Sequence, residues 1–330
     1  MLGEFFSLCS IGFGLSVALM GMVWSVAVRI KNAGIVDIAW AGGFYPLAAI
    51  FAFSTSGYPT RRVLIAVMVA VWSLRLATHL YFRVAGKHPQ EDGRYAKLRA
   101  DWGADFDRRL LWFFQLQAGL LVVLSVPFLI ACLNTTTALS RIEWLGFLVW
   151  LTGVVGEAVA DWQLNRFKAS PENRGKTCMV GLWRYSRHPN YFFEWLVWVG
   201  FFLFALGSPW GWLTIYCPAL MLHFLLRVTG IPATEAEALR TKGDEYRRYQ
   251  ATTNQFVPWF PHAPVMASPF AAGAAPTPRP AMARAETVSS EPAPTPAPAQ
   301  LNAPPSSATS RAPKTAASGT QFHRKPKGPV

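Results

Sequence analysis

Seven long apolar runs constrain the fold of this chain more than any other feature of its sequence. Each run is long enough, or nearly so, to cross the roughly 30 Å hydrocarbon layer of a bilayer as a helix of about 20 residues. They lie at residues 5–28, 35–54, 62–82, 110–133, 142–165, 191–207 and 210–228. Only Ser208 and Pro209 separate the last two runs, which predicts a tight hairpin turn. The predicted fold is an all-α polytopic membrane bundle of about seven transmembrane helices.

The composition favours a membrane protein over a nucleic-acid-binding protein. Hydrophobic residues make up 52% of the chain and charged residues only 15%, whereas soluble domains carry about 25% charged residues. The formal net charge is +13, but the basic residues stand between the apolar runs and do not gather on one basic face. We therefore expect basic loops and a bilayer environment, no nucleic-acid partner and no obligate protein partner.

The distribution of lysine and arginine predicts how the helices are oriented. Connections on one side of the membrane carry fifteen of these residues, most of them between residues 83 and 109 and between 166 and 187. The opposite side carries three, namely Arg61, Arg62 and Arg141. Because basic loops stay in the cytoplasm, we expect the N-terminus outside and the C-terminus in the cytoplasm, in a bacterial inner membrane.

The chain divides into a membrane-embedded domain, residues 1–261, and a tail, residues 262–330. The end of the first domain is a polar cap, 231–261, in which TEAEALRTKGDEYRRYQ is predicted to be helical. The tail is rich in Ala, Pro, Ser and Thr and is basic. A segment of this composition buries too little apolar surface to fold, so the tail is predicted to be disordered.

Ionisable residues inside the apolar runs are costly and usually face a cavity or a partner. Three pairs occur at a spacing of four residues, which places both members on one face of a helix. These pairs are Arg75 with His79, Glu157 with Asp161, and His223 with Arg227. Two basic faces and one acidic face are predicted to close around a polar cavity near the cytoplasmic ends of the helices. The alternative is a set of ion pairs that only fix helix packing.

Several kinds of chemistry find no support in the sequence. His79, His88, His188 and His223 stand alone, without the HxxxH or HxxHH spacing of a membrane diiron site, so no metal site is expected. The Gly-rich signatures of soluble nucleotide-binding folds are missing, as is a nucleophile elbow.

The stretch GLWRYSRHPNYFFE, residues 181–194, concentrates polar chemistry just before the sixth apolar run. Arginine forks such as that of Arg187 suit phosphate, and a helix N-terminus adds unpaired N–H groups. Asn190 is predicted to cap the helix that starts near Tyr191. Trp183 and Tyr191 can stack on a flat ring, although aromatic residues also favour the membrane interface. The interface alone does not explain Glu194, one turn inside the helix.

These residues, with EAVADWQLNRFK at 157–168, resemble the DUF1295 family, of the steroid 5-alpha-reductase C-terminal type. Further blocks of the sequence agree with this family in the same order: VDIAW (36–40), WSLRLATHLYFR (72–83), EDGRYAKLRADWG (91–103), GWLTIYCPALMLHFLLRVTGIP (211–232) and TTNQFVPWFP (252–261). The resemblance covers residues from about 30 to 261.

The resemblance implies a seven-helix steroid 5-alpha-reductase-like membrane fold that holds NADPH at its cytoplasmic side. It implies hydride transfer to an activated carbon–carbon double bond of a lipid-like substrate such as a steroid, sterol, fatty or isoprenoid compound. Carried over by position, Glu194 and Tyr216 are the candidate catalytic residues. The candidate cofactor-binding residues are Asp161, Lys168, Trp183, Arg187, His188, Asn190, Tyr191 and Arg227.

Steroid reductases hold the substrate ketone with a glutamate and a tyrosine from their early helices. The corresponding region here offers Asp37, Tyr45 and Tyr81, none of which is a clear match. The resemblance therefore does not single out a steroid among the lipid-like substrates.

Two alternatives stay open. Isoprenylcysteine carboxyl methyltransferases and related lipid methyltransferases also carry an RHPxY block, and a trailing EAExLRxxxGxxYxxY pattern that residues 235–249 resemble. Those enzymes bind S-adenosylmethionine. The Phe192-Phe193-Glu194 continuation and the blocks at 36–40, 161–168 and 252–261 favour the reductase. The second alternative is a lipid-binding membrane protein without catalytic turnover.

Overall fold

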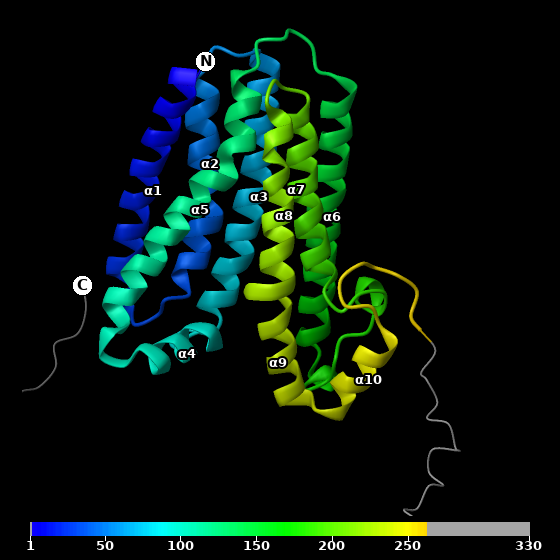
Figure 1. The fold of residues 1–330 in the computed structure, drawn as a ribbon. Coiled ribbons are helices and arrows are strands. Elements are labelled where there is room, and N and C mark those ends of the chain that lie inside the picture. Colours follow the sequence, from blue (N-terminus) through cyan, green and yellow to red (C-terminus); the bar gives the residue numbers. More distant parts are fainter. Residues whose placement is uncertain (1, 263–330) are drawn as a thin grey trace, which may run out of the picture. The chain divides into compact units, whose positions relative to one another are not determined.

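The structure is a computed structural model that describes residues 2–262. Among these residues, seven helical segments are long and apolar enough to cross a membrane (Figure 1). Six of them contain α1 (Leu2–Ile30), α2 (Ile35–Ser54), α3 (Pro59–Ala85), α5 (Phe106–Leu133), α6 (Arg141–Ala169) and α7 (Pro189–Leu206). The seventh runs through a 3-10 turn (Gly211–Ile215), α8 (Tyr216–His223), a π-turn (Phe224–Val228) and α9 (Ile231–Lys242). The predicted all-α polytopic membrane bundle is confirmed.

The helix ends follow simple local rules, and one predicted start is wrong. The second helix coincides with the predicted range 35–54. Helix α3 begins earlier than predicted because Pro59 occupies its first turn, where no backbone N–H is needed. The last membrane segment does not begin as an α-helix at residue 210. Trp210 adopts a left-handed conformation, φ 65°, at the hairpin turn, and a 3-10 turn precedes α8.

Helices α6 and α7 approach each other closely because glycines line their interface. A Cβ atom at Gly200 would lie 2.5 Å from the backbone nitrogen of Trp150, and one at Gly153 would lie 2.7 Å from that of Val197. Small residues allow such backbone contact between membrane helices. This contact sets the register that brings the acidic face of α6 against the first turns of α7.

A buried ion pair fastens the bundle at the end where α2 finishes and α3 and α6 start. Arg61 pairs with Glu143, and both side chains are almost fully buried. The guanidinium also donates to the carbonyl oxygens of Asn134 (3.0 Å), Thr136 (2.7 Å) and Ala138 (2.6 Å). The sequence analysis assigned Arg61 only to a loop, so this fastener was not predicted.

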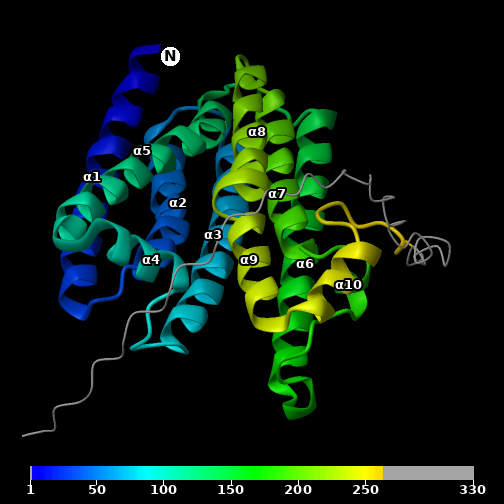
Figure 2. The same cartoon turned by 60° about the horizontal axis from the view of Figure 1, so that its bottom comes forward.

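The opposite end of the bundle, where α3 and α6 finish and α7 starts, is called here the basic end. Two short amphipathic helices lie there: α4 (Gly93–Trp102) beside α1, α2 and α5, and α10 (Asp244–Thr252) beside α6 (Figure 2). Asp37, at the start of α2, holds the first turn of α4 by accepting from Arg94 (2.7 Å) and from the hydroxyl of Tyr95 (2.7 Å).

The polar cap differs from its prediction in one respect. Gly243, with φ +53°, separates α9 from α10, so the stretch predicted as one helix forms two. Of the predicted disordered tail, 262–330, only His262 is among the described residues; its backbone N–H donates to the carbonyl oxygen of Thr252 (2.8 Å).

Candidate functional site

A cluster of ionisable side chains lies inside the apolar bundle and joins α3 to α6. Arg75 of α3 donates from Nη1 to Oδ2 of Asp161 at 3.1 Å, and its Nη2 contacts Oε1 of Glu157. One turn further along α3, Nδ1 of His79 lies 3.4 Å from the same Oδ2. The side chains of Glu157 and Asp161 are 6% and 8% exposed. The predicted meeting of a basic face with an acidic face therefore occurs for two of the three pairs.

Helix α7 completes this cluster, which we call the membrane acid cluster: Arg75, His79, Glu157, Asp161, Asn190 and Glu194. Asn190 donates from Nδ2 to Oδ1 of Asp161 at 3.2 Å. The buried carboxyl group of Glu194 accepts hydrogen bonds from two indoles, at Oε2 from Trp72 (2.8 Å) and at Oε1 from Trp198 (3.0 Å). Contacts join five of these side chains, and Glu194 lies within electrostatic range of Arg75 and Glu157.

Aromatic rings wall off the side of Glu194 that faces away from Arg75. The rings of Trp72 and Trp198 meet edge to face with their centroids 5.1 Å apart, and the ring centroid of Phe44 lies 5.2 Å from that of Trp72. The ring centroids of Phe128 and Phe201 are 4.8 Å apart. All five side chains are buried. Because a carboxylate in such surroundings has little access to water, its two N–H donors are what make its burial tolerable.

The two indole donors were missed by the sequence analysis, although the spacing rule applied to the charges would have found them. Trp72 lies three residues before Arg75, and Trp198 lies four residues after Glu194. Both spacings put the indole on the same helix face as the charged group. Tryptophan in an apolar run is normally assigned to the hydrophobic core, so neither tryptophan was predicted to donate a hydrogen bond.

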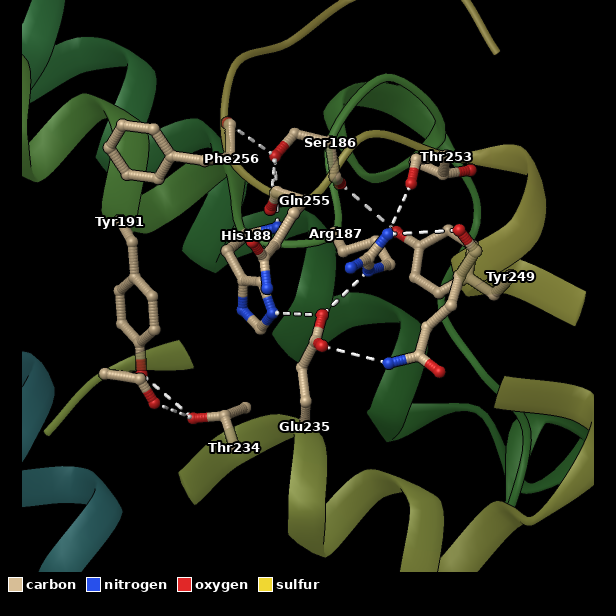
Figure 3. Close-up of polar contacts among 12 residues, drawn as sticks. Ser186, Arg187, His188, Tyr191, Thr234, Glu235, Tyr249, Thr253, Gln255 and Phe256 are labelled. Carbon is tan, nitrogen blue, oxygen red and sulfur yellow. Dashed lines mark hydrogen bonds and ion pairs between the residues drawn. The ribbon is translucent and has the colours of Figure 1, made fainter. Parts of the chain in front are cut away.

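A second polar group, which we call the clasp, ties the start of α7 to α9 (Figure 3). The Nε of Arg187 donates to Oε1 of Glu235 at 2.7 Å, and Nε2 of His188 lies 3.2 Å from the same oxygen. Gln250 of α10 donates to the other oxygen of Glu235 at 2.9 Å. The buried RHP segment therefore holds α9 and α10 against α7.

Backbone contacts extend the clasp to the last described residues. Nη1 of Arg187 donates to the carbonyl oxygens of Thr253 (2.6 Å) and Gln250 (3.2 Å). The hydroxyl of Tyr249 donates to the carbonyl oxygen of Ser186 at 3.1 Å. Further along, the N–H of Trp259 donates to the carbonyl oxygen of Tyr185 at 2.9 Å. Several donors of Arg187, predicted to grip an anionic cofactor, are thus engaged by the protein itself.

Electrostatics in the clasp favour a neutral histidine. Burial lowers the pKa of His188 below its ordinary value of 6.5, although hydrogen bonding to Glu235 opposes the shift. A neutral ring with its proton on Nε2 donates to Glu235 and leaves Nδ1 as an acceptor. The ring of Tyr191 stacks on that of His188 at 5.4 Å.

Other predicted cofactor-binding residues have mixed surroundings. Trp183 is buried and donates from its indole to the carbonyl oxygen of Ala160 at 2.9 Å, so its ring is part of the core. The hydroxyl of Tyr191 lies 3.2 Å from that of Thr234, in an exposed position. Asn190 is not the helix cap. Helix α7 starts at Pro189, two residues before the predicted start at Tyr191, and the cap residue is His188.

Lys168 belongs to a group of cations at the basic end. Its ammonium lies within electrostatic range of Arg83, Lys87 and Lys242. None of the three lysines forms an ion pair within residues 2–262, whereas Arg83 pairs with Asp37 at 3.3 Å. His79 lies within range of Arg83 and Lys168 and thereby links these cations to the membrane acid cluster. Lys87 and Lys242 were not predicted, because neither lysine belongs to a motif or to a charge pair at helical spacing.

Three predicted residues lie apart from the membrane acid cluster. The side chains of His223 and Arg227 are exposed, so the third basic pair does not close on the acidic face as expected. The hydroxyl of Tyr216 donates to the carbonyl oxygen of Val123 at 2.6 Å. Val123 lines an open groove of about 380 Å³ between α1 and α5. No hydrogen bond joins Tyr216 to Glu194 in the described part of the chain.

The His, Cys, Asp and Glu side chains of residues 2–262 include no group arranged to hold a metal ion. The arrangement instead suits proton and anion chemistry. The membrane acid cluster supplies carboxyl groups in a medium of low dielectric constant, and the basic end supplies cations close by.

The fold and the site define a polytopic helical membrane protein with a buried acid–base cluster near a cationic end. The chain belongs to the DUF1295 family, described as a protein of unknown function, whose model matches residues 23–253. It is also similar to an uncharacterized protein of Schizosaccharomyces pombe, with 30% identity over 221 residues. That match covers 59% of this chain and 64% of the relative, so the chain spans less than two thirds of the relative's length. No solved structure matches the chain.

Proposed function

We propose that this membrane protein is an NADPH-dependent reductase that acts on a carbon–carbon double bond of a lipid-like substrate. The observation that carries the proposal is that the membrane acid cluster, through His79, lies within electrostatic range of Lys168, one of the unpaired lysines of the basic end. The phosphates and the nicotinamide ring of such a cofactor need two different environments, one cationic and one shielded from water, within reach of each other.

The basic end suits the phosphates. Lysines bind phosphate as point charges, and Lys87, Lys168 and Lys242 repel one another unless an anion lies between them. We expect this end to face the cytoplasm, since basic loops stay there and the nucleotide is found there. Several donors of Arg187 are engaged within the clasp. The clasp would therefore shape the basic end without contacting the phosphates.

The membrane acid cluster suits the nicotinamide end. Nε of Arg75 is buried and has no hydrogen-bond partner within the described residues. A carboxamide oxygen is an acceptor that would satisfy this donor. The residues that would hold the cofactor are therefore Arg75 at the carboxamide and the three lysines at the phosphates. Bound NADPH supplies a hydride; the chain has to orient the substrate, exclude water and supply a proton.

Water exclusion is supported by the aromatic wall. Trp72, Trp198 and Phe44 close the cluster from the bilayer interior, and a dry site strengthens local electrostatics and protects a hydride. Likeness of the sequence blocks to steroid 5-alpha-reductase C-terminal-type proteins adds support for a reductase. A lipid-like substrate fits a site that is enclosed by membrane helices.

Ligand binding to the full chain in detergent tests the proposal. NADPH and S-adenosylmethionine are titrated separately while the fluorescence of tryptophans such as Trp72 and Trp198, which lie beside the cluster, is followed. We expect saturable quenching by NADPH and none by S-adenosylmethionine. Tight binding of S-adenosylmethionine without NADPH binding would overturn the reductase in favour of a methyltransferase. Mass spectrometry of co-purified lipid, incubated with NADPH, then looks for a product two hydrogens heavier.

A further inference from the structure

The membrane acid cluster contains more carboxyl groups than cations. Glu157, Asp161 and Glu194 face each other across α6 and α7, and Glu157 lies within electrostatic range of Glu194. Opposite them, α3 contributes Arg75, which is always charged, and His79, which is partly exposed. Three carboxylates that share one permanent cation leave excess negative charge in a membrane interior, which is expensive, and a proton is the simplest neutralising ligand.

The carboxyl oxygens of the cluster differ in their hydrogen-bond partners. Both oxygens of Glu194 accept from indole N–H groups, which can only donate. Each oxygen of Glu194 therefore has a donor partner. Both oxygens of Asp161 are likewise occupied, Oδ1 by the amide of Asn190 and Oδ2 by the guanidinium of Arg75.

Glu157 is different. Its Oε1 contacts Arg75, but its Oε2 is buried and has no hydrogen-bond partner among residues 2–262. Of the six carboxyl oxygens in the cluster, this is the one that faces no donor in the described structure. A proton on Oε2 avoids an unpartnered negative charge and makes this oxygen an O–H donor.

We propose that Glu157 carries a proton inside the membrane and is the proton-donating residue of the site. The donor role rests on the proposed function, whereas carriage of the proton does not. In the reaction, the O–H bond of Glu157 breaks and a C–H bond forms at one carbon of the double bond. The hydride from NADPH forms the C–H bond at the other carbon, so NADP⁺ and the Glu157 carboxylate remain. Water at the basic end returns the proton, with His79 on the route.

Infrared spectroscopy of the full chain tests proton carriage without any substrate. A protonated carboxyl group has a C=O stretching band that is distinct from the carboxylate bands and shifts in D₂O. We expect the band in the wild type at neutral pH and its loss in Glu157→Gln. The control is Glu172→Gln, which removes an exposed glutamate just after α6 and should keep the band. If Glu157→Gln does not fold, Glu157→Asp keeps a carboxyl group and should shift the band.

The opposite results are equally clear. A band that persists in folded Glu157→Gln, or a band that does not move in Glu157→Asp, would overturn the assignment. So would a wild type without any band at neutral pH. NADPH titration of the same samples separates the two proposals: a band without NADPH binding removes the reductase and keeps the proton site. If NADPH binds, Glu157→Gln should slow product formation about 100-fold or more and leave NADPH affinity intact.

Discussion

The Nη1 atom of Arg75 lies 3.1 Å from Oδ2 of Asp161, and this contact joins α3 to α6 within the apolar bundle. The same guanidinium reaches Glu157. Arg75 therefore neutralises the acidic face of α6 and also ties two halves of the bundle together. Its removal would leave buried carboxyl groups without their cation.

Arg75→Gln is expected to destabilise the protein strongly. Breaking a buried ion pair by removing one partner costs about 3–5 kcal/mol, because the other charge stays buried and uncompensated. The measurement is thermal unfolding in mild detergent. Arg166→Gln is the control, since Arg166 lies on α6 with an exposed side chain and should melt like the wild type. Equal melting of Arg75→Gln and wild type would show that the cluster does not stabilise the bundle.

Glu235→Gln is expected to loosen the clasp. Glu235 accepts from Arg187 at 2.7 Å and from Gln250 at 2.9 Å, and its side chain is 12% exposed. Glutamine cannot accept at both ends, so α9 and α10 should detach more often from α7. Limited proteolysis should then cut more rapidly within 231–262. Glu237→Gln changes an exposed residue on the same helix and should leave the cleavage rate unchanged; unchanged cleavage of Glu235→Gln would refute the role of the clasp.

The clasp should also respond to pH through His188. Its folded-state pKa lies below 6.5 because of burial, so the folded state favours the neutral ring. The stability from this preference is present above the unfolded pKa of about 6.5 and is lost as pH falls below it towards the folded pKa. Melting temperatures measured from neutral to mildly acidic pH should therefore decline, and His188→Gln should flatten this decline. His88→Gln, at an exposed histidine, should keep the slope; a slope unchanged in His188→Gln would exclude His188 as its source.

Most of the membrane fold could be predicted from the sequence because the bilayer itself imposes the pattern. A run such as 35–54 has only one way to satisfy its backbone in lipid, and α2 coincides with it. The junctions were harder. Trp210 takes a left-handed conformation that few residues other than glycine adopt, and Gly243 breaks the polar cap where propensity alone favours one long helix.

The candidate site was predictable only in part, because spacing gives helix faces but not which faces meet. It located Arg75 opposite the acidic face of α6, yet it also placed Arg227 there, and that side chain is exposed. The RHP segment read as an anion grip because arginine and histidine suit phosphate. The structure gives both side chains an internal partner, Glu235, 47 or more residues away in the chain. Sequence distance hides such a partner.

Gly200→Ala is expected to separate α6 from α7. The new Cβ would lie 2.5–2.6 Å from backbone atoms of Trp150, which cannot rotate away as a side chain would. Overpacking of this kind typically costs about 1–3 kcal/mol. Thermal unfolding in detergent measures it, and the membrane acid cluster should loosen as Asp161 and Asn190 move apart. Gly119→Ala introduces the same methyl group in α5, where nothing lies within 4 Å, and should be neutral; a neutral Gly200→Ala would contradict the close packing.

Lys168→Gln and Lys242→Gln should each weaken NADPH binding without changing stability, if the basic end holds the phosphates. Neither lysine has an ion-pair partner among the described residues, so its loss leaves no buried charge behind. Removal of one charge-assisted hydrogen bond, about 1.5 kcal/mol, corresponds to an increase of about tenfold in Kd. Fluorescence titration gives the Kd, and added salt should reduce the difference between wild type and variants, because salt screens exposed charges. Lys97→Gln is the control, since this exposed lysine of α4 is not among the cations near Lys168. If Lys97→Gln weakens binding as much as Lys168→Gln does, the attraction comes from net charge alone and the three lysines form no phosphate site.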